Sequence, residues 1–205
     1  MEDNSRNIVE TAEYEPNRIV IVKWVQILFV CQVVRVVIVL INAIPEIPSF
    51  TNWISSIVSA IVIFALFQLA IVNERYRKAS IFYCVSVGGA IVVSLLNMSL
   101  LALPLSICAI IASYHEFNAY SEITASKDIK LSNRWHSLFY VEIFTGIIAG
   151  TIGVVPMIIA AFAGVDTEVL ISLFTLVLAM INVVVELLHV VYLKQTISLY
   201  QKLES

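Results

Sequence analysis

Residues that could do chemistry lie in the last long apolar stretch of the chain, where residues 182–189 read N-V-V-V-E-L-L-H. Asn182, Glu186 and His189 follow one another at i, i+4 and i+7, so a helix presents all three on one face. Glu-x-x-His is also the ligand pair of di-iron helix bundles, which carry it twice together with further glutamates. This sequence contains the pair once, and the pattern therefore favours a polar helix face over a di-metal centre.

A second polar face lies in the first apolar stretch, where Gln32 and Arg35 are three residues apart. A charged side chain at the centre of a bilayer costs about 2.5 to 3.5 kcal/mol, so Arg35 needs a carboxylate partner. The rise per residue along each helix places Glu186 at a depth that the side chain of Arg35 can reach. We therefore predict an Arg35–Glu186 ion pair that joins the first and last helices, with Glu142 as the alternative partner. The predicted intramembrane polar cluster consists of Gln32, Arg35, Glu142, Asn182, Glu186 and His189.

All three histidines and three glutamates fall near one end of the expected helices. The candidate metal ligands are His115, Glu116, His136, Glu142, Glu186 and His189. Three interpretations stay open for these residues: polar ties between helices, which we favour, a proton or ion pathway, or a metal or catalytic centre. We find no Ser-His-Asp order, Walker loop or glycine-rich nucleotide loop, so we expect no catalytic residues and no cofactor.

The segments that position these residues are strongly apolar. The 205 residues are 60% hydrophobic and 13% charged, with a mean hydropathy of +0.94, whereas soluble domains carry about 25% charged residues. Residues 79–114 form one apolar run that would be about 54 Å long as a single helix, against a hydrocarbon core of about 30 Å. We therefore predict a fold-back at 97–99, as two full spans or as a re-entrant hairpin.

The predicted fold class is all-α: a polytopic integral membrane protein with a six-helix transmembrane bundle built from three helical hairpins. A short disordered cytoplasmic tail is expected over residues 1–18, and a cytoplasmic extension of the last helix over 194–205. On the last helix, continued by that extension, Leu193, Ile197 and Tyr200 share one face. The expected transmembrane domain is 19–193, with helices at about 19–44, 53–72, 79–96, 99–114, 138–163 and 169–193.

Positive charge gives the predicted orientation, because lysine and arginine in short loops mark the cytoplasmic side. In a six-helix arrangement, eleven of the twelve basic residues lie on one side, and Arg35 is the exception. Both termini are therefore expected in the cytoplasm, with the protein in the plasma membrane of a prokaryote. The eleven are Arg6, Arg18, Lys23, Arg75, Arg77, Lys78, Lys127, Lys130, Arg134, Lys194 and Lys202.

Small residues indicate where helices pack closely. Gly146 and Gly150 form a GxxxG pattern that Gly153 extends, and Ser86 and Ala90 belong to a similar stripe of small residues in the third helix. Without a hydrophobic driving force in lipid, such residues let two backbones approach and associate. The sequence leaves open whether the partner is in the same chain or in a second copy.

Three functions remain open. The first is a non-enzymatic scaffold, assembly factor or accessory subunit, favoured by the absence of any reaction motif. The second is a small transporter or channel that uses the intramembrane polar cluster, and the third is a membrane enzyme with a metal at the cytoplasmic rim. Expected partners are the lipid bilayer and a second copy or a membrane partner subunit. Since no dense basic cluster is present, we expect no nucleic acid.

Overall fold

The computed structural model describes residues 2–42, 50–96, 101–151 and 167–202, and these ranges contain six α-helices. No strand occurs in them, which confirms the predicted all-α class. The helices are α1 (Glu2–Asn42), α2 (Phe50–Leu69), α3 (Glu74–Leu96), α4 (Ala102–Ala125), α5 (Ile129–Thr151) and α7 (Thr167–Gln201).

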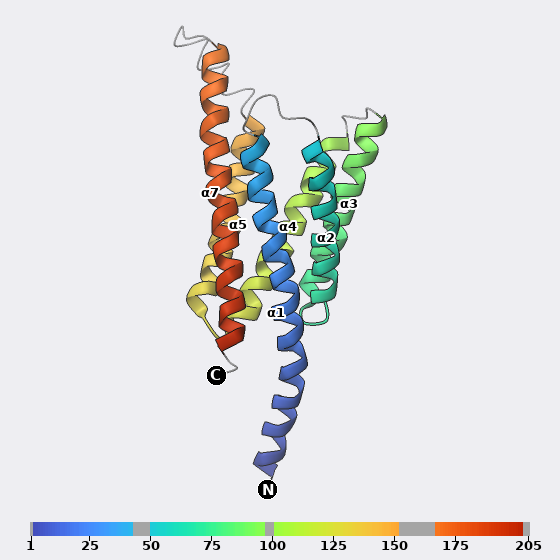
Figure 1. Ribbon diagram of the computed structural model, residues 1–205, viewed down its shortest axis with the longest axis vertical. Coiled ribbons are helices and arrows are strands. Elements are labelled where there is room, and N and C mark those ends of the chain that lie inside the picture. Colours follow the sequence, from blue (N-terminus) through green and yellow to red (C-terminus); the bar gives the residue numbers. More distant parts are fainter. Residues whose placement is uncertain (1, 43–49, 97–100, 152–166, 203–205) are drawn as a thin grey trace.

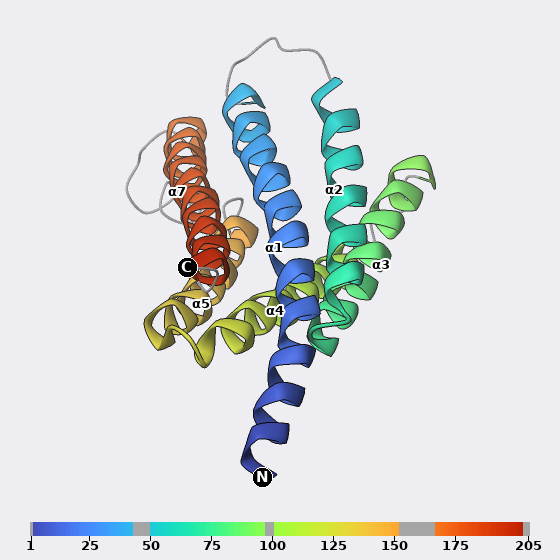
Figure 2. The same cartoon turned by 60° about the horizontal axis from the view of Figure 1, so that its bottom comes forward.

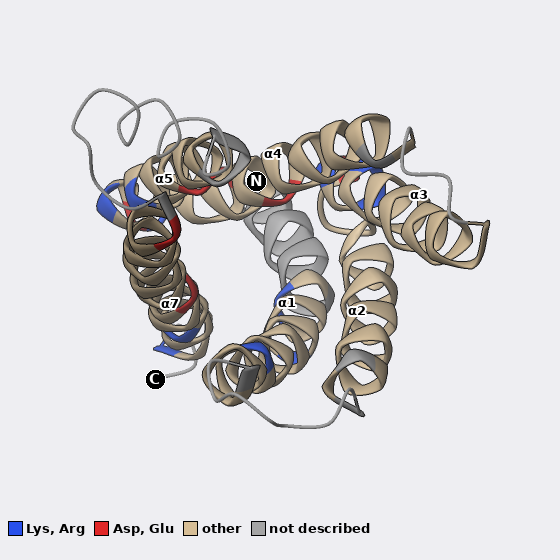
Figure 3. Ribbon diagram, turned by 90° about the horizontal axis from the view of Figure 1, so that it is seen from above, with Lys and Arg blue, Asp and Glu red and all other residues tan. Residues whose placement is uncertain are grey.

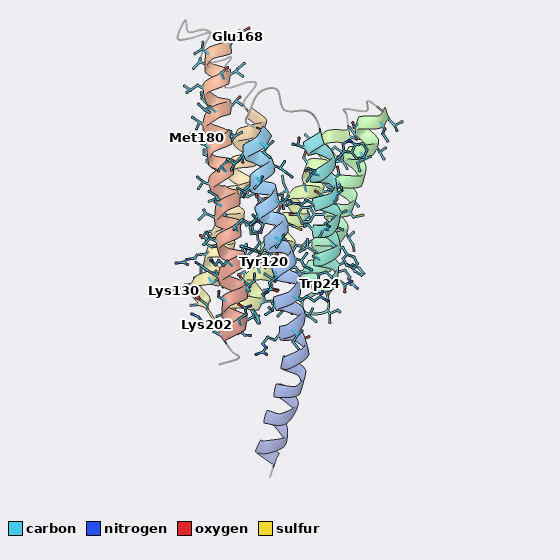
Figure 4. The ribbon with its side chains drawn as sticks, in the orientation of Figure 1. Trp24, Tyr120, Lys130, Glu168, Met180 and Lys202 are labelled. Atoms are coloured by element: carbon cyan, nitrogen blue, oxygen red, sulfur yellow. The ribbon has the colours of Figure 1, made fainter. Side chains whose placement is uncertain are left out.

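The helices stand side by side in a closed ring. Each contacts its neighbours in chain order, and α7 returns to pack against α1, as the view from above shows (Figure 3). Consecutive helices run antiparallel, so both termini lie at the same end of the ring (Figure 1). Lys130 and Lys202 lie at that end and Glu168 at the opposite end (Figure 4).

Three helices contain segments long and apolar enough to cross a membrane by length and composition: Asn17–Ile41, Glu74–Leu96 and Glu168–Gln201. The apolar part of α2, Trp53–Leu69, is shorter. The prediction of six apolar spans is thus met for half of the helices by this criterion. Polar side chains inside α4 and α5 lower their apolarity, and the predicted span 138–163 continues into residues outside the described ranges.

The structure differs from the prediction at the N-terminus. Instead of a disordered tail over residues 1–18, α1 begins at Glu2 and continues without a break to Asn42. Its first turns extend away from the ring (Figures 1 and 2). Once a helix is nucleated, each added residue needs no new nucleation and gains one backbone hydrogen bond, which is how a polar segment can extend a stable apolar helix.

The apolar run 79–114 forms two antiparallel helices, α3 and α4, that pack along each other. The predicted fold-back at 97–99 lies outside the described residues, but the chain reverses direction between Leu96 and Ala102 (Figure 1). With 23 and 24 residues, each helix is longer than the about 20 residues that one membrane crossing needs.

Close helix packing occurs at a glycine of α3. A Cβ added to Gly89 would overlap the side chain of Leu105 in α4, and the hydroxyl of Ser86 donates to the Leu105 carbonyl at 3.1 Å. At Gly146, by contrast, a Cβ would meet no described atom within 4 Å. The small residues of α3 therefore make the close contact, and Gly146 makes none within the described part of the chain. The surroundings of Gly150 are not described, and Gly153 lies outside the described residues.

The best-packed part of the protein is an aromatic core near the end that holds both termini. Trp135 of α5 is fully buried and stacks on Tyr120 of α4, with ring centroids 4.4 Å apart. Its indole N–H donates to the hydroxyl of Thr196 in α7 at 3.3 Å. Tyr200, on the buried face of the α7 extension, donates to the carbonyl of Ile123 at 2.7 Å. These contacts fix α4, α5 and α7 relative to one another.

Candidate functional site

A cavity of about 380 Å³ lies inside the ring, bounded by α1, α3, α4, α5 and α7. Sites for small molecules typically have volumes of about 300 to 1,000 Å³, so this cavity has room for a small solute. All six members of the predicted polar cluster line it: Gln32, Arg35, Glu142, Asn182, Glu186 and His189. The residues come together because α7 closes the ring against α1, two helices that lie far apart in the sequence.

Helices α1 and α7 are in contact, as predicted, but the polar tie between them is not the predicted ion pair. The side-chain amide of Gln32, which is buried, donates to the carboxylate of Glu186. Arg35, one turn further along α1, forms no ion pair or hydrogen bond with any described residue, neither with Glu186 nor with Glu142. Its guanidinium faces the same cavity as both carboxylates without contacting them.

A chain of hydrogen bonds joins three residues of the cavity lining, Glu142, Ser113 and Tyr83, to a buried carboxyl group outside the lining. The hydroxyl of Ser113 donates to Glu142 at 2.9 Å and lies 3.1 Å from the hydroxyl of Tyr83. Tyr83 in turn donates to Glu116 at 2.8 Å. Tyr120 also donates to Glu116, at 3.4 Å. The chain thus joins two carboxyl groups, one on α5 and one on α4, through a tyrosine of α3.

Glu116 is the more deeply placed of these two carboxyl groups. It follows the predicted span 99–114 and is 4% exposed. Burial raises the pKa of Glu116 above its usual range, because the charged form loses its hydration. The hydrogen bond from Tyr83 and the positive charge of Arg35 oppose that shift.

The three histidines have different surroundings. His189 is enclosed by aromatic rings, with centroids at 5.2 Å from Phe117 and 5.4 Å from Trp135. His115 stacks on Phe82, its Nδ1 is buried without a partner among the described residues, and burial lowers its pKa. His136 is exposed on α5.

These positions do not support the metal-centre interpretation. Among the described residues, no three His, Cys, Asp or Glu side chains are placed to hold a metal ion. Of the six candidate ligands, only Glu142, Glu186 and His189 reach the cavity. The reason is helical rotation, because residues at similar depth point in different directions when they lie on different helix faces.

The neutral polar residues of the site were not predicted from the sequence. Tyr83 and Ser113 connect the two carboxyl groups, and Thr145 lines the cavity beside them. Hydroxyl side chains are common in membrane helices, where they hydrogen-bond their own backbone, as Thr145 does to the Val141 carbonyl at 2.7 Å. The one available signal was that Ser113 precedes Glu116 by three residues, which places both on one helix face.

The comparisons with known proteins found no matching family model, no matching curated protein and no matching solved structure. The chain is therefore characterised by its own fold and site: an all-α ring of helices with a polar cavity at its centre and large apolar side chains on its outside.

Proposed function

We propose that this chain is a multi-pass integral membrane protein whose six helices all cross the bilayer, and that it acts as a small transporter or channel. The observation that carries the proposal is the position of Arg35, which faces the central cavity without forming an ion pair with the described carboxylates around it.

Apolar residues on the outside and polar residues on the inside support the membrane assignment. Trp53, Leu95 and Leu103 are 72 to 78% exposed, on three different helices. Exposed apolar surface of this extent is unfavourable in water and typical of a lipid-facing surface. The two less apolar helices, α4 and α5, would cross with their polar faces turned to the cavity, where lipid is excluded. α2 is apolar over Trp53–Leu69 and does not line the cavity. By the positive-inside rule, both termini would be cytoplasmic.

Arg35 has no ion pair among the described residues, and this favours transport over a purely structural role. In a scaffold, a charge inside the membrane would be expected to pair with a carboxylate, because an unpaired charge costs about 2.5 to 3.5 kcal/mol there. Here Glu142 and Glu186 line the same cavity, yet they bond to Ser113 and Gln32 instead of Arg35. A guanidinium that faces a cavity without a carboxylate partner in the described part of the chain can bind an incoming anion through several donors at once.

The mixture of charges indicates the kind of solute. Arg35 offers a site for a carboxylate or another small anionic group, whereas Glu142 and Glu186 offer sites for a cationic group. The volume of about 380 Å³ suits a small molecule rather than a peptide. We propose a small polar solute that carries an anionic group.

Access of water to the cavity is the decisive test. The three cysteines, Cys31, Cys84 and Cys108, are first replaced by alanine. A single cysteine is then introduced in place of Asn182 or of Met180. Asn182 lines the cavity, whereas Met180, two residues away on the same helix, is 64% exposed on its outer side (Figure 4). Thiols react as thiolates, which form in water and not in lipid.

The expected result is that a membrane-impermeant thiol reagent labels N182C in liposomes and does not label M180C. If neither cysteine reacts from either side, the cavity is closed to water and the structural role becomes the better explanation. Solute specificity is then measured by uptake into liposomes, with R35Q expected to abolish uptake. R134Q serves as the control, because Arg134 lies on the surface, bonded to Gln195.

A further inference from the structure

We propose that the hydrogen-bonded chain Glu142–Ser113–Tyr83–Glu116 is a proton-binding site that holds one proton shared between its two carboxyl groups. Glu142 lines the central cavity, so it can exchange this proton with the cavity contents. Glu116 lies 4% exposed at the inner end of the chain. Proton binding here does not depend on whether the cavity carries a solute across the membrane.

Counting protons in the chain leads to this inference. Three contacts join the four groups, at 2.9 Å, 3.1 Å and 2.8 Å. The two hydroxyl groups supply one proton each, and with both carboxylates ionised these protons point to Glu142 and Glu116. The Ser113–Tyr83 contact would then bring two oxygens together with no proton between them. A third proton, on either glutamate, completes all three hydrogen bonds.

The surroundings also favour an additional proton. Arg35 reaches the cavity from α1, while Glu186 and His189 face it from α7 and Tyr120 bonds to Glu116 within α4. Three carboxyl groups thus share the region with one fixed positive charge. Like charges at short range and burial both favour the neutral form of a carboxyl group, so one of them should be protonated.

The two positions of the shared proton are related by a simple relay. With the proton on Glu142, its O–H points to Ser113, the Ser113 O–H points to Tyr83, and the Tyr83 O–H points to the ionised Glu116. If each proton moves to the next oxygen, three O–H bonds break and three form. Glu142 becomes the carboxylate and Glu116 the acid. Each hydroxyl group has lost one proton and gained another, and its O–H now points the opposite way along the chain. One unit of positive charge has moved between the cavity wall and the buried carboxyl group.

Glutamine variants test the sharing directly. A glutamine side chain keeps the shape of a protonated glutamate and donates an N–H, so in E142Q or E116Q the third hydrogen bond forms without an extra proton. The remaining glutamate should then be ionised. Purified protein is examined by infrared spectroscopy at neutral pH, where an ordinary glutamate, with a pKa of about 4.3, is ionised. The readout is the C=O stretching band of protonated carboxyl groups, identified by its shift in heavy water.

The expected result is that E142Q and E116Q each remove the same band intensity and that the double variant E116Q/E142Q removes no more. E122Q, which changes an exposed glutamate on the same helix as Glu116, should leave the band unchanged. If the unsubstituted protein has no band that either variant removes, both glutamates are ionised and the proposal is overturned. Loss in only one of the two single variants would place the proton on one residue and overturn the sharing. Labelling of N182C tests the transport proposal separately, so either proposal can fail alone.

Discussion

The tie between α1 and α7 gives the most direct energetic test of the structure. Replacing Gln32 with methionine keeps nearly the same volume and removes the amide that donates to Glu186. The carboxylate then loses its described interhelical donor at the point where the ring closes. We expect Q32M to destabilise the fold and E186L to do the same, whereas the double variant should cost less than the sum of the two.

The magnitude follows from the kind of bond and its burial. Hydrogen bonds to charged groups contribute about 1.5 to 3 kcal/mol in soluble proteins, whereas interhelical bonds in membrane proteins average about 0.6 and reach about 1.7 kcal/mol. Gln32 is only 3% exposed, so the bond should lie towards the upper end of the membrane range. We expect a coupling free energy of about 1 to 2 kcal/mol between the two positions.

The assay is a double-mutant cycle on the free energy of unfolding, measured by reversible denaturation in mixed micelles. A parallel cycle pairs R35M with E186L. Arg35 forms no ion pair with Glu186 in the structure, but its charge acts on that carboxylate across the cavity they share. That cycle should therefore show a coupling that falls as salt is added, whereas the Gln32–Glu186 coupling should not change with salt. A salt-independent Arg35–Glu186 coupling together with no Gln32–Glu186 coupling would refute the geometry of the α1–α7 contact and restore the ion pair predicted from sequence.

Two further predictions concern α3 and α4. Both G89A and G88A gain the higher helix propensity of alanine. G89A should be the less stable of the two by about 1 kcal/mol, because its Cβ overlaps the end of the Leu105 side chain, which has to move, whereas a Cβ at Gly88 meets no described atom within 4 Å. Equal unfolding free energies for the two variants would contradict the described α3–α4 packing. The pKa of Glu116 is raised in the folded protein, so the folded state binds a proton at this residue more tightly than the unfolded state does. The contribution of this proton to the free energy of unfolding is complete below the ordinary glutamate pKa of about 4.3. It is lost as pH rises through the raised pKa. Unfolding free energies measured against pH should therefore fall over that window in the unsubstituted protein and less steeply in E116Q, and parallel curves would contradict the shift.

The sequence by itself determined the features that depend on local composition and spacing. Apolar runs with few charges indicate the helices, and six helices are what the described chain contains. The buried face of the α7 extension, with Leu193, Ile197 and Tyr200, could be identified from spacing alone. The members of the polar cluster were also recognisable, because charged and amide side chains are conspicuous in apolar segments.

Only the tertiary structure decided which of these side chains meet. One residue along a helix is a rotation of about 100°, so a small change in how a helix is turned exchanges one partner for another. For this reason Gln32 rather than Arg35 bonds to Glu186, and Gly89 rather than Gly146 makes the close contact. Closure of α7 onto α1 likewise turned a set of separate polar residues into the lining of one cavity. This closure depends on how all six helices pack together, so local sequence does not determine it.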